Sequence, residues 1–263
     1  MGGILLGLLL CASVDPRAHV LVVKGTLDGK PLRVLVDTGG SGGVSPALAR
    51  KLPPIPGKAA RFAGASGQWR QSKLYAISGL RLGDTEIPPF QAIALPLHEG
   101  VRYDLVIGLP ELKRFLVEID LRRNTFCLRQ DAPAIAGQPF ERKGDGPILV
   151  PATVGPRPFE HLILDTGAGV TTLTKTFLPE VPHRPRPESV VSVDGSGVRR
   201  KQFFVEVDRI CLFGHCKPKQ VVMPDDDLSQ LNGFPVDGIL GMTFLKGFRI
   251  TLDLPHGRIA IDG

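Results

Sequence analysis

The residues of this chain that could do chemistry are two aspartates, each placed at the end of an apolar run. Asp37 follows residues 34–36 and Asp165 follows residues 162–164, and each aspartate opens an Asp-Thr-Gly triplet. One such triplet recurs by chance. Two copies about half a chain apart, each behind a β-type run, indicate two similar lobes that bring one carboxylate each to a common cleft.

The residue types around the two aspartates suit proton transfer. Two carboxylates held close together cannot both ionise, so the pKa of one rises and the pair shares a proton. The ionised carboxylate can then take a proton from a water while the protonated one polarises a carbonyl. Gly39 and Gly167 allow backbone to approach the carboxylates because they have no Cβ. The hydroxyls of Thr38 and Thr166 are well placed to bond backbone in the opposite lobe.

The composition favours a turn-rich, mainly β protein. Among 263 residues there are 31 glycines and 24 prolines, and stretches of helical period are few. The formal charge of +6 is spread along the chain. The densest basic spots, residues 184–186 and 199–201, have no interleaved aromatic residues, so we expect solvated surface there and no nucleic-acid partner.

The N-terminal segment has the character of a leader. Residues 4–12 are apolar, residues 11–13 include small side chains where a signal peptidase could cut, and the run is too short to span a bilayer. We therefore expect residues 1–18 to be a signal segment of an exported protein, periplasmic or secreted, without a stable membrane span. A structural N-terminal strand is the alternative. Lipid anchoring at Cys11 is not expected, because Leu10 stands where such sites need a small residue.

The cysteines divide into a predicted disulfide and a predicted free thiol. Cys211 and Cys216 flank a tight hairpin turn at residues 213–214, which would place them as a non-hydrogen-bonded pair that can form a disulfide. A zinc site that uses His215 lacks a fourth ligand, so we expect no metal and no cofactor. Cys127 lies on an apolar strand and is predicted to be a buried free thiol.

The local pattern is repeated in the two halves. In each, a strand pair ends on the aspartate, a short helical candidate follows (residues 46–52 and 175–178), and then a glycine-rich hairpin tip (residues 64–67 and 194–197). A second hairpin comes next, over residues 80–95 and 210–223. The two halves therefore carry the same elements in the same order.

The closing segments of the halves align without a gap at an offset of 133, which places residues 104–108 on residues 237–241. This correspondence indicates an internal duplication of a unit of about 110 residues. The aspartates that it matches, such as Asp104 and Asp237, are expected to anchor turns. The domains predicted on this basis are an N-terminal lobe at residues 19–129, a linker at 130–146 and a C-terminal lobe at 147–263.

Three features of each half, taken in order, resemble the retropepsin-like aspartic proteases in their fused, two-lobe bacterial form. They are the Asp-Thr-Gly, the glycine-rich tip and a later apolar pair before glycine, which ends at Gly108 or Gly241. The resemblance covers nearly the whole chain from His19. It implies an all-β fold of two β-barrel lobes related by a pseudo-twofold axis, with Asp37 and Asp165 as the catalytic pair in the cleft between them.

The same resemblance implies an aspartic endopeptidase that acts on a peptide or protein substrate. As both lobes are in one chain, a monomer would suffice. The glycine-rich tips would be flaps over the substrate, formed by Gly64, Ala65, Ser66, Gly67, Gly195, Ser196 and Gly197. Ordinary turn chemistry remains an equal reading of the two serines. The alternative function is a catalytically silent peptide-binding module on the same fold.

Two positions depart from the pepsin pattern, in which a hydroxyl residue follows the Asp-Thr-Gly. Gly40 and Ala168 stand there instead and offer no hydroxyl to the aspartates. Gly40 is followed by residues 41–43, Ser-Gly-Gly, so the sequence leaves open how the first catalytic loop is kept rigid.

Overall fold

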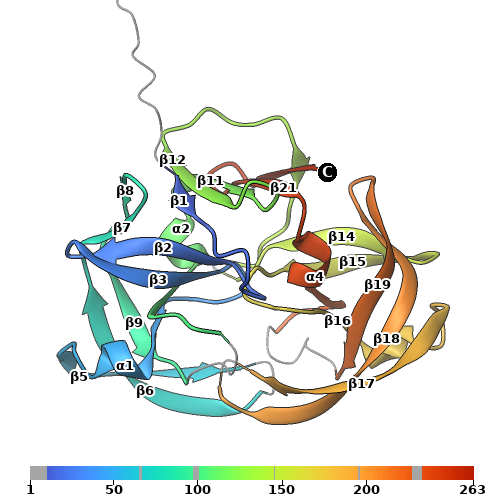
Figure 1. Cartoon of the computed structure of the whole chain (residues 1–263), viewed down its shortest axis with the longest axis horizontal. Helices are drawn as coiled ribbons and strands as arrows, with labels where there is room; N and C mark the ends of the chain where they lie inside the picture. The colour runs from blue at the N-terminus through green and yellow to red at the C-terminus, as the bar shows by residue number, and fades with distance from the viewer. Residues whose placement is uncertain (1–10, 65–66, 97–100, 145, 195, 227–232) are drawn as a thin grey trace, which may run out of the picture.

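The computed structural model describes residues 11–64, 67–96, 101–144, 146–194, 196–226 and 233–263. The protein is mainly β and forms three sheets, which confirms the predicted all-β fold. In Figure 1 the first half of the chain lies on the left, the second half on the right, and one sheet built from both lies at the top.

The first half forms a nine-stranded sheet in the order β5-β6-β9-β4-β10-β3-β2-β7-β8. Its strands are β2 (Val22–Leu27), β3 (Lys30–Asp37), β4 (Gly43–Val44), β5 (Pro54–Ala63), β6 (Trp69–Ile77), β7 (Leu80–Leu82), β8 (Thr85–Glu86), β9 (Phe90–Ala94) and β10 (Leu105–Gly108). Two short helices accompany it, α1 (Pro46–Ala49) and α2 (Leu109–Leu112).

The second half forms a seven-stranded sheet in the order β14-β15-β20-β16-β19-β18-β17. Its strands are β14 (Leu149–Val154), β15 (Arg157–Leu164), β16 (Thr171–Thr174), β17 (His183–Val193), β18 (Arg199–Leu212), β19 (His215–Asp225) and β20 (Gly238–Leu240). A 3₁₀ turn, η1 (Lys175–Phe177), and the helix α4 (Met242–Leu245) accompany it.

The two halves use the same register behind their aspartates. In the first half β10 runs parallel to β3, with Leu105 opposite Val34. In the second half β20 runs parallel to β15, with Gly238 opposite Leu162. Leu105 and Gly238 are aligned positions, so each half places its apolar-apolar-glycine segment identically beside the strand that leads to the aspartate.

A six-stranded sheet joins the halves. Its strands are β1 (Ala12–Ser13), β11 (Phe115–Asp120), β12 (Thr125–Gln130), β13 (Gln138–Pro139), β21 (Arg249–Asp253) and β22 (Arg258–Asp262), and β11 pairs antiparallel with β21. Glu118 lies opposite Thr251, its own aligned position. The pairs on either side of this point are exchanged by the alignment: Leu116 pairs with Asp253, and their aligned positions, Arg249 and Asp120, pair with each other. A local twofold axis therefore relates β11 to β21.

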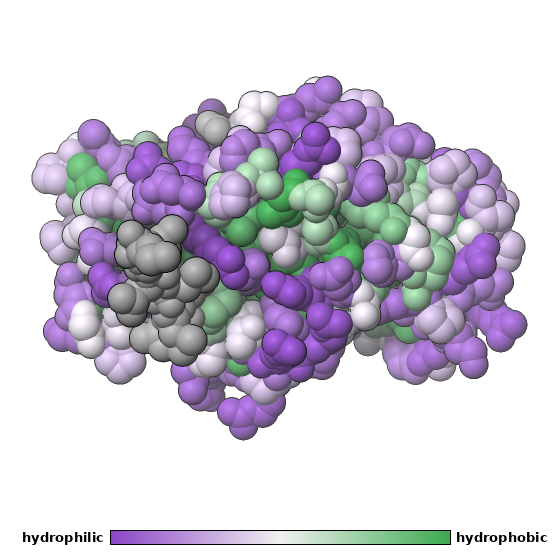
Figure 2. Space-filling view, turned by 90° about the horizontal axis from the view of Figure 1, so that it is seen from above, coloured by the Kyte–Doolittle hydropathy of each residue, from purple (hydrophilic) through white to green (hydrophobic). Residues whose placement is uncertain are grey.

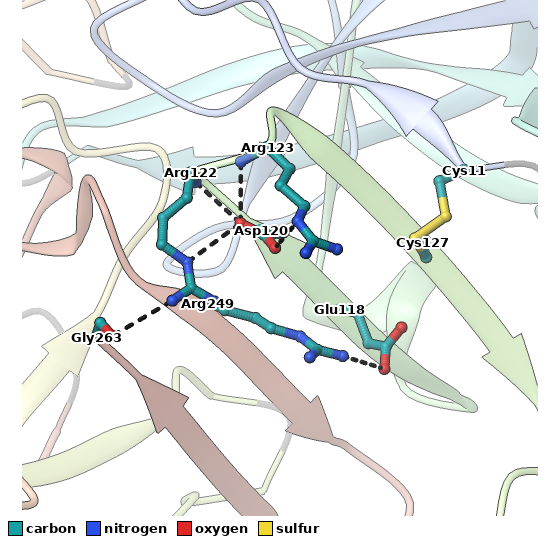
Figure 3. A network of polar contacts seen from close by, with 8 residues as sticks. All are labelled: Cys11, Glu118, Asp120, Arg122, Arg123, Cys127, Arg249 and Gly263. Carbon is teal, nitrogen blue, oxygen red and sulfur yellow. Dashed lines mark hydrogen bonds and ion pairs between the residues drawn. A yellow bond between two sulfur atoms is a disulfide. The ribbon is translucent and has the colours of Figure 1, made fainter.

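Polar contacts fix one end of this sheet (Figure 3). Asp120 accepts hydrogen bonds from the backbone N–H groups of Arg122 and Arg123, each at 3.0 Å. Glu118 pairs with Arg249 at 3.3 Å and with Arg129 at 3.0 Å. Burial raises the pKa of Asp120, but the backbone N–H groups and the guanidinium charges of Arg122 and Arg123 together lower it below its ordinary value. Asp120 is thus a turn anchor, as the sequence predicts.

A continuous hydrophobic core runs through both halves and under the shared sheet. Phe115, Phe126, Phe177 and Phe244 are among its largest fully buried side chains. Seen from above in Figure 2, the surface is mostly hydrophilic, and apolar residues gather near the middle of this face. Within the part of the chain that the structure describes, no helix is both long and apolar enough to cross a membrane.

The predicted turns are formed as expected, while two predicted elements differ. Asp28–Gly29 and Phe213–Gly214 all have positive φ, as two-residue hairpin turns require. The helix predicted over residues 46–52 ends at Ala49, because prolines at residues 53 and 54 cannot continue it. In the first half the second hairpin is broken into β7, β8 and β9, since Pro88 and Pro89 have no N–H to donate, whereas β18 and β19 are continuous.

The predicted free thiol at Cys127 is wrong. Cys127 forms a disulfide with Cys11, with Cα atoms 4.5 Å apart. The reason is the pairing of β1 with β12, which sets Ala12 opposite Phe126 and so brings Cys11 beside Cys127 (Figure 3). Residues 11–18 of the predicted leader are therefore packed on the first half, and residues 1–10 lie outside the described residues.

The second disulfide is confirmed. Cys211 and Cys216 are directly paired across the β18–β19 hairpin and bonded, with Cα atoms 4.0 Å apart. The described cysteines include no free thiol. Two disulfides are compatible with an extracellular location.

Candidate active site

The two aspartates lie at equivalent strand ends and meet. Asp37 is the last residue of β3, and Asp165 directly follows β15. Their side chains are hydrogen-bonded to each other. Residues 128 positions apart are thus brought together at the junction of the two halves, as the sequence predicts.

Crossed hydrogen bonds from two threonines fix this junction. The Thr38 hydroxyl donates to the carbonyl of Leu164 at 2.7 Å, and the Thr166 hydroxyl donates to the carbonyl of Val36 at 2.6 Å. Each hydroxyl also accepts from the backbone N–H of the other threonine, at 3.0 and 3.3 Å. Both threonines are fully buried, where every polar group needs a partner. Each half therefore holds the strand end of the other.

The glycines of the triplets are required because each lies against the opposite aspartate. A Cβ placed on Gly39 would lie 2.5 Å from Oδ2 of Asp165, and one on Gly167 would lie 2.5 Å from Cγ of Asp37. A Cβ on Gly40 would lie 2.7 Å from Oδ2 of Asp37. The first loop therefore needs glycine at Gly40.

Backbone N–H groups point at both carboxylates, but unequally. Asp37 Oδ1 accepts from Gly39 at 3.0 Å, and the N–H of Gly40 also interacts with this carboxylate. Asp165 Oδ1 accepts from Gly167 at 2.7 Å and from Ala168 at 3.1 Å. Hydrogen bonds to a carboxylate favour its ionised form. The N–H of Gly39 also lowers the pKa of Asp165, so three backbone groups stabilise the Asp165 anion and two stabilise the Asp37 anion.

The electrostatics follow from this difference. Burial raises the pKa of Asp37 well above its ordinary value, and the charge of Asp165 raises it further. Burial also raises the pKa of Asp165, but the N–H groups of Gly167 and Ala168 and the hydrogen bond from Asp37 oppose that rise. The pKa of Asp37 is therefore the more strongly raised of the two, and the two groups titrate as one unit.

The glycine-rich tips of the hairpins β5–β6 and β17–β18 touch each other. A Cβ on Gly64 would lie 2.5 Å from Oδ2 of Asp194 and from the backbone N of Ser196. Asp194 also closes its own turn, since its Oδ1 accepts from the Ser196 hydroxyl at 2.7 Å. Gly67 and Gly197 both have positive φ, near 80°. The predicted flap residues Ala65, Ser66 and Gly195 lie outside the described residues.

The other matched aspartates anchor backbone away from the pair. Asp104 accepts from the N–H of Arg33 at 2.9 Å, and Asp237 accepts from the N–H of His161 at 2.9 Å. Among the described residues no group of three or more His, Cys, Asp or Glu side chains could hold a metal ion.

One residue near the site was missed by sequence reasoning. Glu111, in α2, accepts a hydrogen bond from the N–H of Gly108 at 2.8 Å and also interacts with the N–H of Gly42, in the first catalytic loop. A glutamate three residues after a glycine is typical of an ordinary helix-capping position, and nothing in its spacing indicates the second contact.

Comparison with known proteins supports the family resemblance for the first half of the chain. Residues 23–110, about a third of the chain, match the family of proteins described as aspartyl proteases. A stretch of 115 residues, 42% of this chain, is 29% identical to the DNA damage-inducible protein 1 of Phaeosphaeria nodorum and spans 25% of that protein. The predicted resemblance to aspartic proteases is confirmed by these matches, and the family match contains Asp37.

Proposed function

We propose that the protein is an aspartic endopeptidase that hydrolyses peptide bonds with a water activated between Asp37 and Asp165. The observation that carries this proposal is the pair itself, two hydrogen-bonded carboxylates of raised pKa, each packed against the glycine of the other loop. A structural role would explain turn aspartates but gives no reason to bury two of them against each other, which is unfavourable for folding.

In the proposed reaction Asp165 is the base and Asp37 the acid. The Asp165 carboxylate takes a proton from the water, whose oxygen attacks the carbonyl carbon of the scissile peptide bond. Asp37 gives its proton to the carbonyl oxygen as the tetrahedral gem-diol forms. Collapse of the gem-diol breaks the C–N bond as Asp165 gives its proton to the leaving nitrogen and Asp37 takes a proton from a gem-diol hydroxyl, which restores the starting state of the pair.

The substrate would lie between this pair and the two hairpin tips. These tips extend from β5–β6 and β17–β18 toward the middle of the lower face in Figure 1 and meet at Gly64 and Asp194. Entry of a peptide would require this contact to open. The predicted substrate-binding role of the flap residues remains part of this proposal.

The alternative is a peptide-binding module that has lost catalysis. It is the weaker reading because inactive relatives of such enzymes are expected to lose an aspartate or its glycine, and here both triplets keep their contacts. Binding without turnover on a mixed peptide library would favour it.

The test is turnover of a mixed peptide library, followed by mass spectrometry, with pepstatin as the inhibitor control. We expect the wild type to cleave and Asp165→Asn to lose nearly all turnover. Asp208→Asn, which changes the same charge at an exposed position of β18, is the matched control and should cleave normally. Cleavage that survives in Asp165→Asn would rule out the two-aspartate mechanism.

We also propose that the protein is exported, as a periplasmic or secreted monomer with lobes at residues 19–129 and 147–263 joined by residues 130–146. The two disulfides support an oxidising compartment. Because Cys11 is bonded to Cys127, cleavage of a leader after residues 11–13 would remove one disulfide partner. Thiol alkylation without reductant should label no cysteine; labelling of Cys127 alone would indicate that Cys11 had been removed.

A further inference from the structure

Glu111 binds two backbone segments that flank Asp37. It is the third residue of α2, and its side chain turns back so that Oε2 accepts from the N–H of Gly108, at the helix start, at 2.8 Å. This bond alone is a helix cap. Gly108 is also the residue of β10 that pairs with Asp37, so the cap is attached to the strand directly behind the aspartate.

The other oxygen of Glu111 reaches the catalytic loop. Oε1 lies 3.1 Å from the position of a Cβ on Gly42, and the N–H of Gly42 interacts with the carboxylate. Gly42 and Gly108 are both buried, so their N–H groups have no water to bond and need a protein acceptor. One side chain therefore serves both segments.

The second half meets the same need with hydroxyl groups. The N–H of Gly241, the position aligned with Gly108, donates to Oγ1 of Thr171 at 3.2 Å. The N–H of Thr171 donates to Oγ1 of Thr243 at 2.9 Å, and the two hydroxyls are hydrogen-bonded at 3.2 Å. Phe244 stands where the first half has Glu111. A titratable carboxylate on one side thus corresponds to non-titrating hydroxyls on the other.

Glu111 can exchange protons with solvent. A cavity of about 250 Å³ opens on it, lined also by Pro88, Pro89, Phe90, Pro110, Lys113 and Arg114. Burial raises the pKa of Glu111 above its ordinary value, although the N–H groups of Gly108 and Gly42 and the charge of Lys113 oppose the rise. Lys113 and Arg114 are the charged groups that face this cavity.

We infer that Glu111 is a positioning residue for the reaction, which holds the Asp37 loop against β10 by accepting from Gly42 and Gly108 at once. This inference rests on the proposed peptidase function. Protonation converts one acceptor oxygen into a donor, so the support is present while Glu111 is ionised and is lost as pH falls through its raised pKa.

The test compares Glu111→Gln with Thr171→Val over a range of pH, on one peptide substrate. Glutamine keeps the shape of the side chain, but its NH₂ group is a donor, so one of the two backbone N–H groups loses its acceptor. We expect Glu111→Gln to lower kcat about tenfold near neutral pH, with KM within about twofold, because only the alignment of the acid changes. The ratio of wild-type to mutant kcat should approach one as pH falls, since the protonated Glu111 of the wild type is then uncharged, like the glutamine of the mutant.

Thr171→Val is the matched control, because it removes the equivalent acceptor without removing a titrating group. Its ratio of wild-type to mutant kcat should be the same at every pH. A Glu111→Gln enzyme with wild-type kcat, or with a ratio that does not change with pH, would overturn the inference. Thermal unfolding of each variant should be measured to keep assays below its Tm.

A second measurement does not depend on catalysis. In the wild-type protein the amide proton shifts of Gly42 and Gly108 should share one titration midpoint, and this common step should be absent from both residues in Glu111→Gln, whatever titration of the aspartate pair remains. Different midpoints for the two amides, or no such step, would overturn the inference that Glu111 binds Gly42 and Gly108 together, even if peptides are cleaved. If no peptide is cleaved but the common titration is found, the proposed function fails while the anchor stands.

Discussion

The two Asp-Thr-Gly loops carry the same triplet in different surroundings. The first continues through Gly40 and Gly42, has no room for a Cβ at Gly40, and is tied to β10 by Glu111. The second has Ala168 in place of Gly40, and the backbone N–H of Ala168 donates to Asp165. Backbone contacts therefore make two similar carboxylates unequal. More backbone N–H groups favour the ionised form of Asp165, while the neighbouring charge raises the pKa of Asp37 further, which supports the proposed roles of Asp165 as base and Asp37 as acid.

The largest effect is expected from the glycines that each loop presents to the other aspartate. Gly39→Ala and Gly167→Ala should each lower kcat/KM by at least about 100-fold, because the new Cβ must displace a carboxylate that has to be held within tenths of an ångström. The measurement is steady-state kinetics on one peptide, with Gly169→Ala as a control for an added Cβ, because there it would meet no atom closer than 3.4 Å. Near-normal activity in either variant would show that the crossed packing is not needed.

The threonines test the mechanical link between the halves. Thr38→Val and Thr166→Val keep shape but remove a hydroxyl that both donates to and accepts from buried backbone. Each should lower the free energy of unfolding by about 1–3 kcal/mol, because buried partners lose their hydrogen bonds. Denaturant titration is the measurement. Since the two sets of bonds mirror each other, a large effect from one variant and none from the other would contradict the symmetric junction.

The smallest expected effect is a shift in the pH dependence of activity, and it tests the difference between Gly40 and Ala168, the residues that follow the two triplets. Ala168→Ser adds a donor beside the ionised Asp165, which stabilises the charge and lowers the first pKa of the pair. Activity needs the singly ionised pair and is lost as pH falls through that pKa, so the acid limb of kcat/KM should move to lower pH. Gly40→Ser should instead impair activity, because its Cβ has no space beside Asp37. An unmoved acid limb in a folded Ala168→Ser enzyme would exclude this hydrogen bond as a determinant.

What could be predicted from the sequence depended on local chemistry and on repetition. The Asp28–Gly29 turn and the Cys211–Cys216 disulfide are decided by residues close in the chain. The meeting of Asp37 and Asp165 was predictable because the same motif occurs twice. The Cys11–Cys127 bond was not, because it depends on the register of a two-residue strand with a partner more than 100 residues away.

Glu111 shows the same limit within the site. Its bond to Gly108 is local, but its contact with Gly42 depends on how α2 packs against the first catalytic loop. The second half gives no matching signal, because Thr171 and Thr243 replace the carboxylate. A side chain that spans two segments of different elements leaves no period or spacing in the sequence.

A double-mutant cycle tests whether Asp37 and Asp165 act as one catalytic unit. The measurement is kcat/KM for the wild type, Asp37→Asn, Asp165→Asn and the double variant on one peptide. If the pair shares one proton and one water, each single change should remove nearly all activity and the double change should cost little more than either. Losses that multiply, or a single variant that keeps more than a few per cent of wild-type kcat, would contradict the account.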